Sequence, residues 1–407
     1  MKGKYLFLKD ILSFFAVLGI VFIPFSFSVT IVQLSSTDFI FGKLIRFVSA
    51  HLFGIELKNT KVYSDSVSMY VLVLLLLIVA VVIGIAVARI KSWRKYRSNI
   101  LSACYTIACY YLILQLLKYG FGKIFKDQFY LPEPNTLFTP VGNIDKDLLY
   151  WTSMGTSRVY NFFAGGVEVL AALLLLFRRT RMAGSLLAFA ALLQVAVINF
   201  SFDISVKLFS LFLLLLTVYL LAPYCQRLYY SFFSNKSVPA AEPATVIIKH
   251  PFTYTSIKCF IIGLILVEVF LPYIRKNNFN DDTAKRPYLH GAYEVKQMIT
   301  GTDTITGDAA LVKRFFIHRN DYMIFQNRAD EMQDYKLSYD ADRYEYILTD
   351  YQQRKTGITL HYSDADSILQ LKYTKGGKPC QLTGKAIDWK KLPLLRKSFH
   401  WTSDGDE

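Results

Sequence analysis

The chain has 407 residues, 53% of them hydrophobic, and its mean hydropathy of +0.31 is high for a soluble protein. Its net charge of +15 does not indicate nucleic-acid binding, because residues 285–407 hold 19 basic and 17 acidic residues and most of the surplus lies in the apolar part. Basic residues are expected there at the ends of membrane helices. We therefore expect a lipid bilayer as partner and no nucleic acid.

Seven apolar runs are long enough to cross a bilayer, which takes about 17–25 residues. They lie at 11–34, 67–90, 99–118, 159–177, 183–200, 205–222 and 256–274. The first run is too long for a signal peptide and no small-residue cleavage site follows it, so we expect it to remain as an anchor. The apolar stretch Phe39–Gly54 is broken by Lys43, Arg46 and His51, which favours an amphipathic helix lying flat in the membrane interface.

Positive charge is concentrated in two short connections between these runs. One is the segment 89–97, with three arginines and two lysines, and the other contains Arg178, Arg179 and Arg181. The positive-inside rule places both connections in the cytoplasm. With seven crossings, the N-terminus is then cytoplasmic and the C-terminal domain is periplasmic. The expected location is a bacterial inner membrane, crossed several times.

The polar C-terminal part alternates apolar and polar residues with a period of two, as half-buried strands do. Eight short strands are expected, around Tyr293, Phe316, Tyr322, Leu337, Tyr346, Leu360, Leu371 and Leu382. Turn residues between them favour hairpins, and closing such a meander into a small, lipocalin-like antiparallel β-barrel would remove its edges. A barrel filled by its own side chains, one with a bound lipid or quinone-like molecule, and an open half-barrel or sandwich all remain open.

The expected fold is thus a membrane α-helical bundle of about seven helices followed by a β-barrel domain. Its parts are an N-terminal helix pair with an interfacial segment (1–98), a four-helix core (99–230), a cytoplasmic linker (231–255), a last helix (256–275) and a periplasmic β domain (285–401). The loop 119–157 contains prolines that stop a helix. It would form a lid over the bundle or pack beneath the β domain.

Unusual polar residues occur within or beside the predicted membrane helices. A charge near the bilayer centre is costly, so it marks either function or a specific pairing. Glu168 lies midway along its run, after Gly165 and Gly166, which would allow close helix approach. The predicted topology places further polar residues in the same outer half: Gln115, Lys123, Arg158, Gln194, Asn199, Asp203 and Lys207.

These eight residues predict a polar pocket open to the periplasm, with Glu168 at its floor. Lys123, Arg158 and Lys207 are the candidate counter-charges. The groups would pair and fix the helix register, bind a small anion or a quinone headgroup, or relay protons through Glu168. The five cysteines form no Cys-x-x-Cys pair and the histidines show no metal-binding spacing, so neither a metal site nor a catalytic residue is predicted.

A set of short motifs runs through the four-helix core. They are Lys118-Tyr-Gly-Phe-Gly-Lys123, Asp127-Gln-Phe129, Tyr160-Asn-Phe-Phe-Ala-Gly-Gly-Val-Glu168, Arg178-Arg-Thr-Arg181 and Asn199-Phe-Ser-Phe-Asp203, followed by Lys207. With them, residues 99 to about 230 resemble the DoxX family of four-helix bacterial membrane proteins. The chain looks most like the longer DoxX-like proteins of Bacteroidetes-type bacteria, which carry extra helices and an outer β domain.

The resemblance implies an architecture more firmly than a reaction. Some DoxX proteins are linked to quinone-reducing sulfur oxidation, as in the small subunit of thiosulfate:quinone oxidoreductase, and others to membrane complexes that handle thiol stress. It therefore implies an accessory subunit of a redox or quinone-linked system, with quinone as a candidate ligand. The alternative is a non-catalytic envelope scaffold whose β domain binds a partner protein or a lipid.

Overall fold

The computed structural model describes residues 2–24, 30–57, 59, 61–234, 250–306, 310–341, 345–375, 377–396 and 401. The chain forms two compact units. The helical unit comprises Met1–Gln128 and Arg158–Asn280, and the barrel unit comprises Phe129–Ser157 and Asp281–Glu407. Most of the predicted cytoplasmic linker, from 235 to 249, lies outside the described residues.

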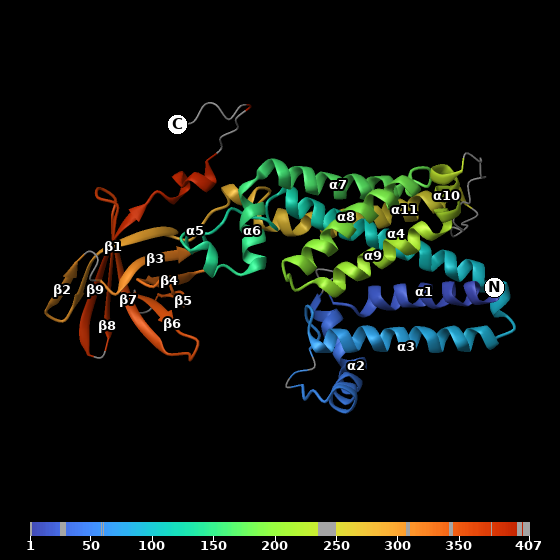
Figure 1. Ribbon diagram of the computed structural model, residues 1–407, viewed down its shortest axis with the longest axis horizontal. Helices are drawn as coiled ribbons and strands as arrows, with labels where there is room; N and C mark the ends of the chain where they lie inside the picture. Colours follow the sequence, from blue (N-terminus) through green and yellow to red (C-terminus); the bar gives the residue numbers. More distant parts are fainter. Residues whose placement is uncertain are drawn as a thin grey trace. The chain divides into compact units, whose positions relative to one another are not determined.

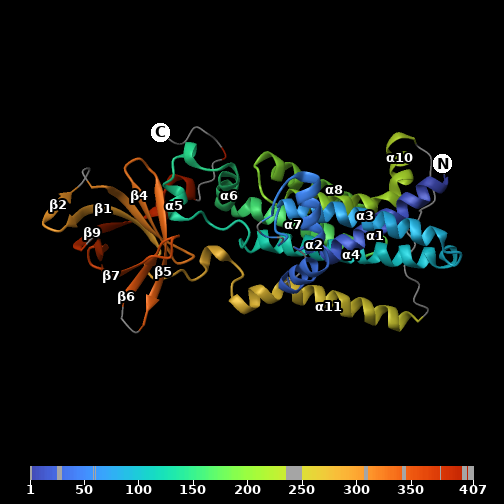
Figure 2. The same ribbon diagram turned by 90° about the horizontal axis from the view of Figure 1, so that it is seen from below.

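The helical unit is built from long helices and one shorter one. They are α1 (Lys2–Phe22), α2 (Thr30–Phe53), α3 (Val67–Arg89), α4 (Trp93–Ile124), α7 (Arg158–Leu176), α8 (Arg181–Ser201), α9 (Lys207–Leu221), α10 (Cys225–Phe233) and α11 (Pro251–Lys276). Most of the long helices lie roughly along one shared axis, namely α1, α3, α4, α7, α8, α9 and α11. Helix α2 lies across that axis (Figures 1 and 2). Helix α4 is the most enclosed, since every residue from Leu112 to Leu117 is buried.

Several of these helices are long and apolar enough to cross a membrane, as expected. Within the described residues six stretches qualify: Val67–Arg89, Trp93–Ile124, Arg158–Leu176, Arg181–Ser201, Lys207–Phe233 and Pro251–Thr283. Helix α3 is the clearest, because it carries no charge before Arg89. It is capped by the preceding Ser66, whose side chain accepts a hydrogen bond from the backbone N–H of Met69.

The predicted first run, 11–34, is wrong in its boundaries. Helix α1 begins at Lys2 and ends at Phe22, and a separate helix, α2, begins at Thr30. Pro24 accounts for the break, because proline lacks a backbone N–H and disfavours helical geometry in the residue before it. The stretch expected to form an interfacial helix, Phe39–Gly54, forms the second half of α2.

Nine strands make up the sheet of the barrel unit. They are β1 (Gly291–Thr300), β2 (Asp303–Thr306), β3 (Val312–His318), β4 (Tyr322–Asn327), β5 (Met332–Asp340), β6 (Glu345–Thr349), β7 (Lys355–Ser363), β8 (Ile368–Lys375) and β9 (Lys378–Ile387). Neighbouring strands are antiparallel, and β1 also pairs with β9. This pairing closes β1 and β3–β9 into an eight-stranded antiparallel barrel, as predicted (Figure 1).

Strand β2 was missed by the sequence analysis. Along one edge of β1, the residues from Gly291 to Glu294 pair with β3, and those from Gln297 to Thr300 pair with β2. A register shift between Val295 and Gln297 separates the two halves on the β9 side. One strand therefore contacts three neighbours, and β2 extends the sheet beyond the closed ring.

Apolar side chains fill the barrel interior, and a second apolar cluster lies on its outside. Inside, the rings of Tyr293 and Phe315 stack at 5.0 Å. The alternate residues of the same strands, such as Ala292 and Phe316, are buried on the other face. There they pack against the segment Phe129–Ser157, which contains α5 (Pro134–Leu137) and α6 (Lys146–Thr156), through residues such as Phe138. Of the two expected positions for this segment, packing on the barrel is thus the one observed.

Candidate functional site

The predicted floor of the pocket is a buried ion pair between α4 and α7. The Nζ of Lys123 donates to both carboxylate oxygens of Glu168, at 2.9 and 2.8 Å. Both side chains are almost fully buried, and the Lys123 Nζ lies 5.8 Å from the ring centre of Tyr119. Of the three candidate counter-charges, Lys123 is the one that lies against Glu168.

Close contact between α4 and α7 sets the geometry of this pair. A Cβ on Gly165 would lie 2.4 Å from the backbone oxygen of Gly120, and one on Gly120 would lie 2.9 Å from that of Gly165. These distances are too short for any side chain, so glycine is required on both helices. By contrast, a Cβ on Gly166 would meet nothing within 4 Å, so only the first of the two predicted glycines serves the helix contact.

Substitution of these adjacent glycines gives a matched test. We expect Gly165→Ala to lower the stability of the helical unit by about 1–3 kcal/mol, because the new methyl group forces the two backbones apart. The variant Gly166→Ala is the control and should have no such cost. Thermal unfolding of the purified protein in detergent measures the stability of both variants. Equal losses of stability would contradict the close contact of α4 and α7 at Gly165.

The other predicted pocket residues differ in their exposure to solvent. Arg158 and Gln194 are exposed, and Gln194 makes one long contact of 3.5 Å with the hydroxyl of Tyr160. Gln115 is buried on α4, two turns before Lys123, and Asn199 is buried near the end of α8. Four of the eight predicted residues are thus buried, namely Gln115, Lys123, Glu168 and Asn199, and a single pocket formed by all eight remains a prediction.

Asp203 and Lys207 belong to a different group, at the start of α9. The Lys207 Nζ lies 2.7 Å from Asp203, whose side chain is largely exposed, and 3.9 Å from Asp65. Asp65 also accepts hydrogen bonds from the backbone N–H groups of Lys207 and Leu208, at 2.8 and 3.0 Å. Asp65 therefore caps α9 from the loop before α3, a role suited to a carboxylate at a helix N-terminus.

The barrel unit contains a second buried cluster of charges, which the sequence analysis missed. Glu133, from the segment before α5, accepts a hydrogen bond from His290 Nε2 at 2.8 Å and one from the backbone N–H of Arg319 at 3.2 Å. His318 Nε2 lies 4.0 Å from the same oxygen. The carboxylate thus joins the segment Phe129–Ser157 to the ends of β1 and β3.

Arg319 extends this cluster to a second carboxylate. Its Nη2 donates to Asp281 at 2.6 Å, and Asp281 also accepts from Arg286 Nη2 at 2.9 Å. The guanidinium lies over the ring of Tyr130 at 4.2 Å. We call Glu133, Asp281, Arg286, His290, His318 and Arg319 the clamp cluster, because they hold three separate parts of the chain together.

Burial and neighbouring charges act in opposite directions on the carboxylates of the clamp cluster. Burial raises the pKa of Glu133, but His290, His318 and the N–H of Arg319 outweigh it and hold the pKa below its ordinary 4.5. Burial likewise raises the pKa of Asp281, and Arg319 and Arg286 bring it below 3.8. Both groups are therefore carboxylates at neutral pH.

His318 behaves as a neutral imidazole in this cluster. Burial lowers its pKa below the ordinary 6.5, although Glu133 partly opposes the shift. Its Nδ1 accepts a hydrogen bond from the backbone N–H of Asn320 at 3.1 Å, so the proton of the neutral ring lies on Nε2, toward Glu133. Protonation at Nδ1 would break the bond to Asn320.

These shifts predict that the barrel unit loses stability in two stages as the pH falls. Below about 6.5 the unfolded chain binds a proton at His318 that the folded one excludes. The same holds below about 4.5 for Glu133 and below about 3.8 for Asp281, whose ion pairs are lost at still lower pH. We expect His318→Gln to remove the first stage and leave the second. Unfolding followed by tryptophan fluorescence from pH 8 to 3 tests this, and an unchanged profile between pH 7 and 5 would contradict it.

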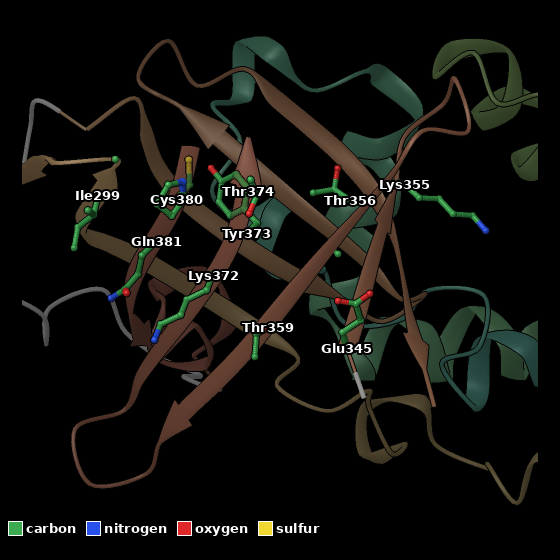
Figure 3. Close-up of a pocket in the computed structure, with 13 residues that line it drawn as sticks. Ile299, Glu345, Lys355, Thr356, Thr359, Lys372, Tyr373, Thr374, Cys380 and Gln381 are labelled. Carbon is green, nitrogen blue, oxygen red and sulfur yellow. The ribbon is translucent and has the colours of Figure 1, made fainter. Parts of the chain in front are cut away.

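A hollow of about 730 Å³ lies on the barrel unit, and its lining contains no residue of the clamp cluster. Strands β1, β6, β7, β8 and β9 supply its lining, which is mainly polar. One row of it, Ile299, Gln381, Lys372 and Thr359, follows the strand register across β1, β9, β8 and β7. Lys355 and Lys372 extend in opposite directions (Figure 3). The hollow therefore offers a broad polar surface rather than a point of concentrated charge.

Comparison with known proteins gives one short similarity. A stretch of 71 residues is 39% identical to the uncharacterized protein YwoB of Bacillus subtilis (strain 168). The stretch covers 17% of this chain and 46% of that protein, so the chain spans less than half the length of this relative. No protein-family model matches the chain, and no solved structure matches it.

Proposed function

We propose that the protein is a multi-span membrane protein of the bacterial envelope that presents its β-barrel as a binding module and catalyses no reaction itself. The observation that carries this proposal is the Lys123–Glu168 pair. Both carboxylate oxygens of Glu168 are occupied by the counter-charge from the neighbouring helix, which suits a helix-to-helix connection. The open polar surface is on the barrel, at the hollow of β1 and β6–β9.

The proposed topology has seven crossings, with α1 as the first and the barrel in the periplasm of an inner membrane. Contacts inside the helical unit support it. Arg181, the first residue of α8, lies over the ring of Tyr105 in the first half of α4, and Arg97, in the first turns of α4, pairs with Asp10 in the first half of α1. The two arginine-rich connections and the N-terminal helix thus meet at one end, which the positive-inside rule assigns to the cytoplasm.

Labelling of single cysteines tests the topology. In a background with the exposed Cys225 and Cys259 replaced by serine, we expect Lys390→Cys to react with a membrane-impermeant maleimide in intact spheroplasts. We expect Arg94→Cys to react only after permeabilisation. The reverse pattern would overturn the orientation, and reaction of both sites in intact spheroplasts would overturn the arrangement of crossings.

Site-specific photo-crosslinking tests the binding module. A benzoyl-phenylalanine in place of Thr359, inside the hollow, should give a defined adduct in cells, with a protein or an envelope lipid identified by mass spectrometry. The control is the same residue in place of Lys385, which also lies on the barrel but outside the hollow. Equal adducts at both positions, or none at Thr359, would contradict a binding role for the hollow.

The accessory role in a redox or quinone-linked system, which the DoxX resemblance implies, is the second candidate. One observation favours it: the acid Glu168, the amine of Lys123 and the phenol of Tyr119 lie close together in the bundle, a set that suits a quinone headgroup or a small anion. Mass spectrometry of purified protein tests it. A quinone bound in stoichiometric amount and lost in Glu168→Gln would favour this candidate over the first.

A further inference from the structure

Helix α2 is held across the end of α1 by hydrogen bonds to the last carbonyl groups of that helix. The side chain of Gln33 donates to the backbone oxygens of Val21 and Ile23, at 2.9 and 2.8 Å, and Thr37 Oγ1 donates to that of Phe22 at 3.0 Å. A helix leaves the carbonyl groups of its last turn without partners inside the helix, so those of Val21 and Phe22 can accept these bonds from α2. The crosswise direction of α2 in Figures 1 and 2 is thus fixed by specific contacts.

The two faces of α2 differ sharply. Phe41, Ile45 and Val48 are buried, and the ring of Phe41 packs edge-on against Phe22 at 5.1 Å. The opposite face exposes large apolar side chains, including Phe39 at 90% and Phe47 at 57%. Water disfavours such a surface, yet α2 is not among the stretches of the described chain that qualify as membrane spans.

Two cations lie on the exposed face of α2. Lys43 occurs between Phe39 and Phe47 at intervals of four residues, so the three side chains share one stripe of the helix. Arg46 lies beside that stripe, and neither cation pairs with a carboxylate in the part of the chain that the structure describes. A long basic side chain among apolar neighbours can bury its stem in hydrocarbon and extend its charge to a phosphate.

From these observations we propose that α2 is an in-plane helix bound to the outer surface of the membrane, with Lys43 and Arg46 contacting anionic lipid headgroups. Phe39 and Phe47 enter the boundary between headgroups and acyl chains, at the shallow depth of about 5–10 Å that such helices occupy. The C-terminal end of α1 then meets the interface through α2. This inference rests on the proposed membrane location and adds a lipid contact to it.

Spin labels placed on the full-length protein in vesicles test the depth of α2. With Cys225 and Cys259 replaced by serine, labels at Phe39→Cys and Phe47→Cys should lie shallow, and a label at Ile78→Cys, exposed on α3, should lie deep. Labels on α2 as deep as the one at Ile78 would show a spanning helix, and labels fully in water would show a helix that binds a protein or nothing. Both results overturn the inference. Water contact at Ile78 would instead overturn the membrane location itself.

Lipid composition tests the headgroup contact. We expect the label at Phe39→Cys to move toward water when phosphatidylglycerol is omitted from phosphatidylcholine vesicles. In the variant that also carries Lys43→Gln and Arg46→Gln, the depth of this label should be the same with and without phosphatidylglycerol. The matched control, Lys355→Gln with Lys372→Gln on the barrel, should retain the movement. A label that does not move in the parent protein would overturn the role of the two cations.

Discussion

Lys123→Met alone should lower the stability of the helical unit by about 3–5 kcal/mol, because it leaves the Glu168 carboxylate buried without its counter-charge. The double variant Lys123→Met with Glu168→Leu should recover most of that loss, since it removes both charges and keeps apolar side chains of similar size at the crossing. Thermal unfolding in detergent or nanodiscs, with Lys123→Met, Glu168→Leu and the double variant compared in one double-mutant cycle, gives the coupling between the two residues.

Lys207→Met is the control for this cycle. Lys207 pairs with Asp203, which is largely exposed, and lies 3.9 Å from Asp65, which keeps its two backbone hydrogen bonds in the variant, so the loss should stay within about 1 kcal/mol. The single variant Glu168→Gln then separates the two proposed roles. A large loss of stability supports a structural ion pair, whereas impaired function with nearly unchanged stability would support the pocket expected from the sequence.

Glu133→Gln should release the segment Phe129–Ser157 from the barrel. The amide cannot compensate the charges of Arg319 and its neighbours, and removing one partner from a buried charge cluster costs about 3–5 kcal/mol. Two measurements check this: the unfolding temperature followed through the buried Trp389, which lies 5.8 Å from His290, and the rate at which a protease cuts between 129 and 157.

Glu294→Gln is the control for the clamp cluster, since Glu294 is half-exposed on β1 and pairs only with a neighbouring lysine on the same strand among the described residues. It should change neither measurement. Faster cleavage of the segment in both variants would show that charge alone loosens the barrel unit. Unchanged cleavage in Glu133→Gln would show that the apolar contacts of Phe138 and its neighbours suffice.

The period-two pattern allowed the barrel to be predicted because each of its eight ring strands places apolar residues on an enclosed face. Strand β2 escaped prediction because Asp303–Thr306 contains a single apolar residue, Ile305, and so shows no alternation. The long helices were predicted from their apolar composition. The boundary between α1 and α2 was missed because the apolar run continues across Pro24, and hydropathy alone does not register the break.

The candidate sites depended on contacts between distant parts of the chain. Glu168 and Lys123 are 45 residues apart, and choosing Lys123 over two other cations required the rotation of α4 and α7 about their axes. Gly165 indicates which face of α7 contacts α4, because a close helix contact requires a residue without a side chain. Glu133 and His290 are 157 residues apart, and no local pattern links a proline-flanked glutamate to a histidine before a strand.

The division of the barrel unit along the chain has a consequence for synthesis. Its first part, Phe129–Ser157, leaves the ribosome before the whole of Arg158–Asn280, and its partner strands come later still. At about 5–20 residues per second, the newly made segment waits some tens of seconds or less for β1 and β3. During that interval Leu131, Leu137 and Phe138 have no barrel surface to cover. A nascent chain stalled before β1 should therefore be the form that recruits envelope chaperones and proteases.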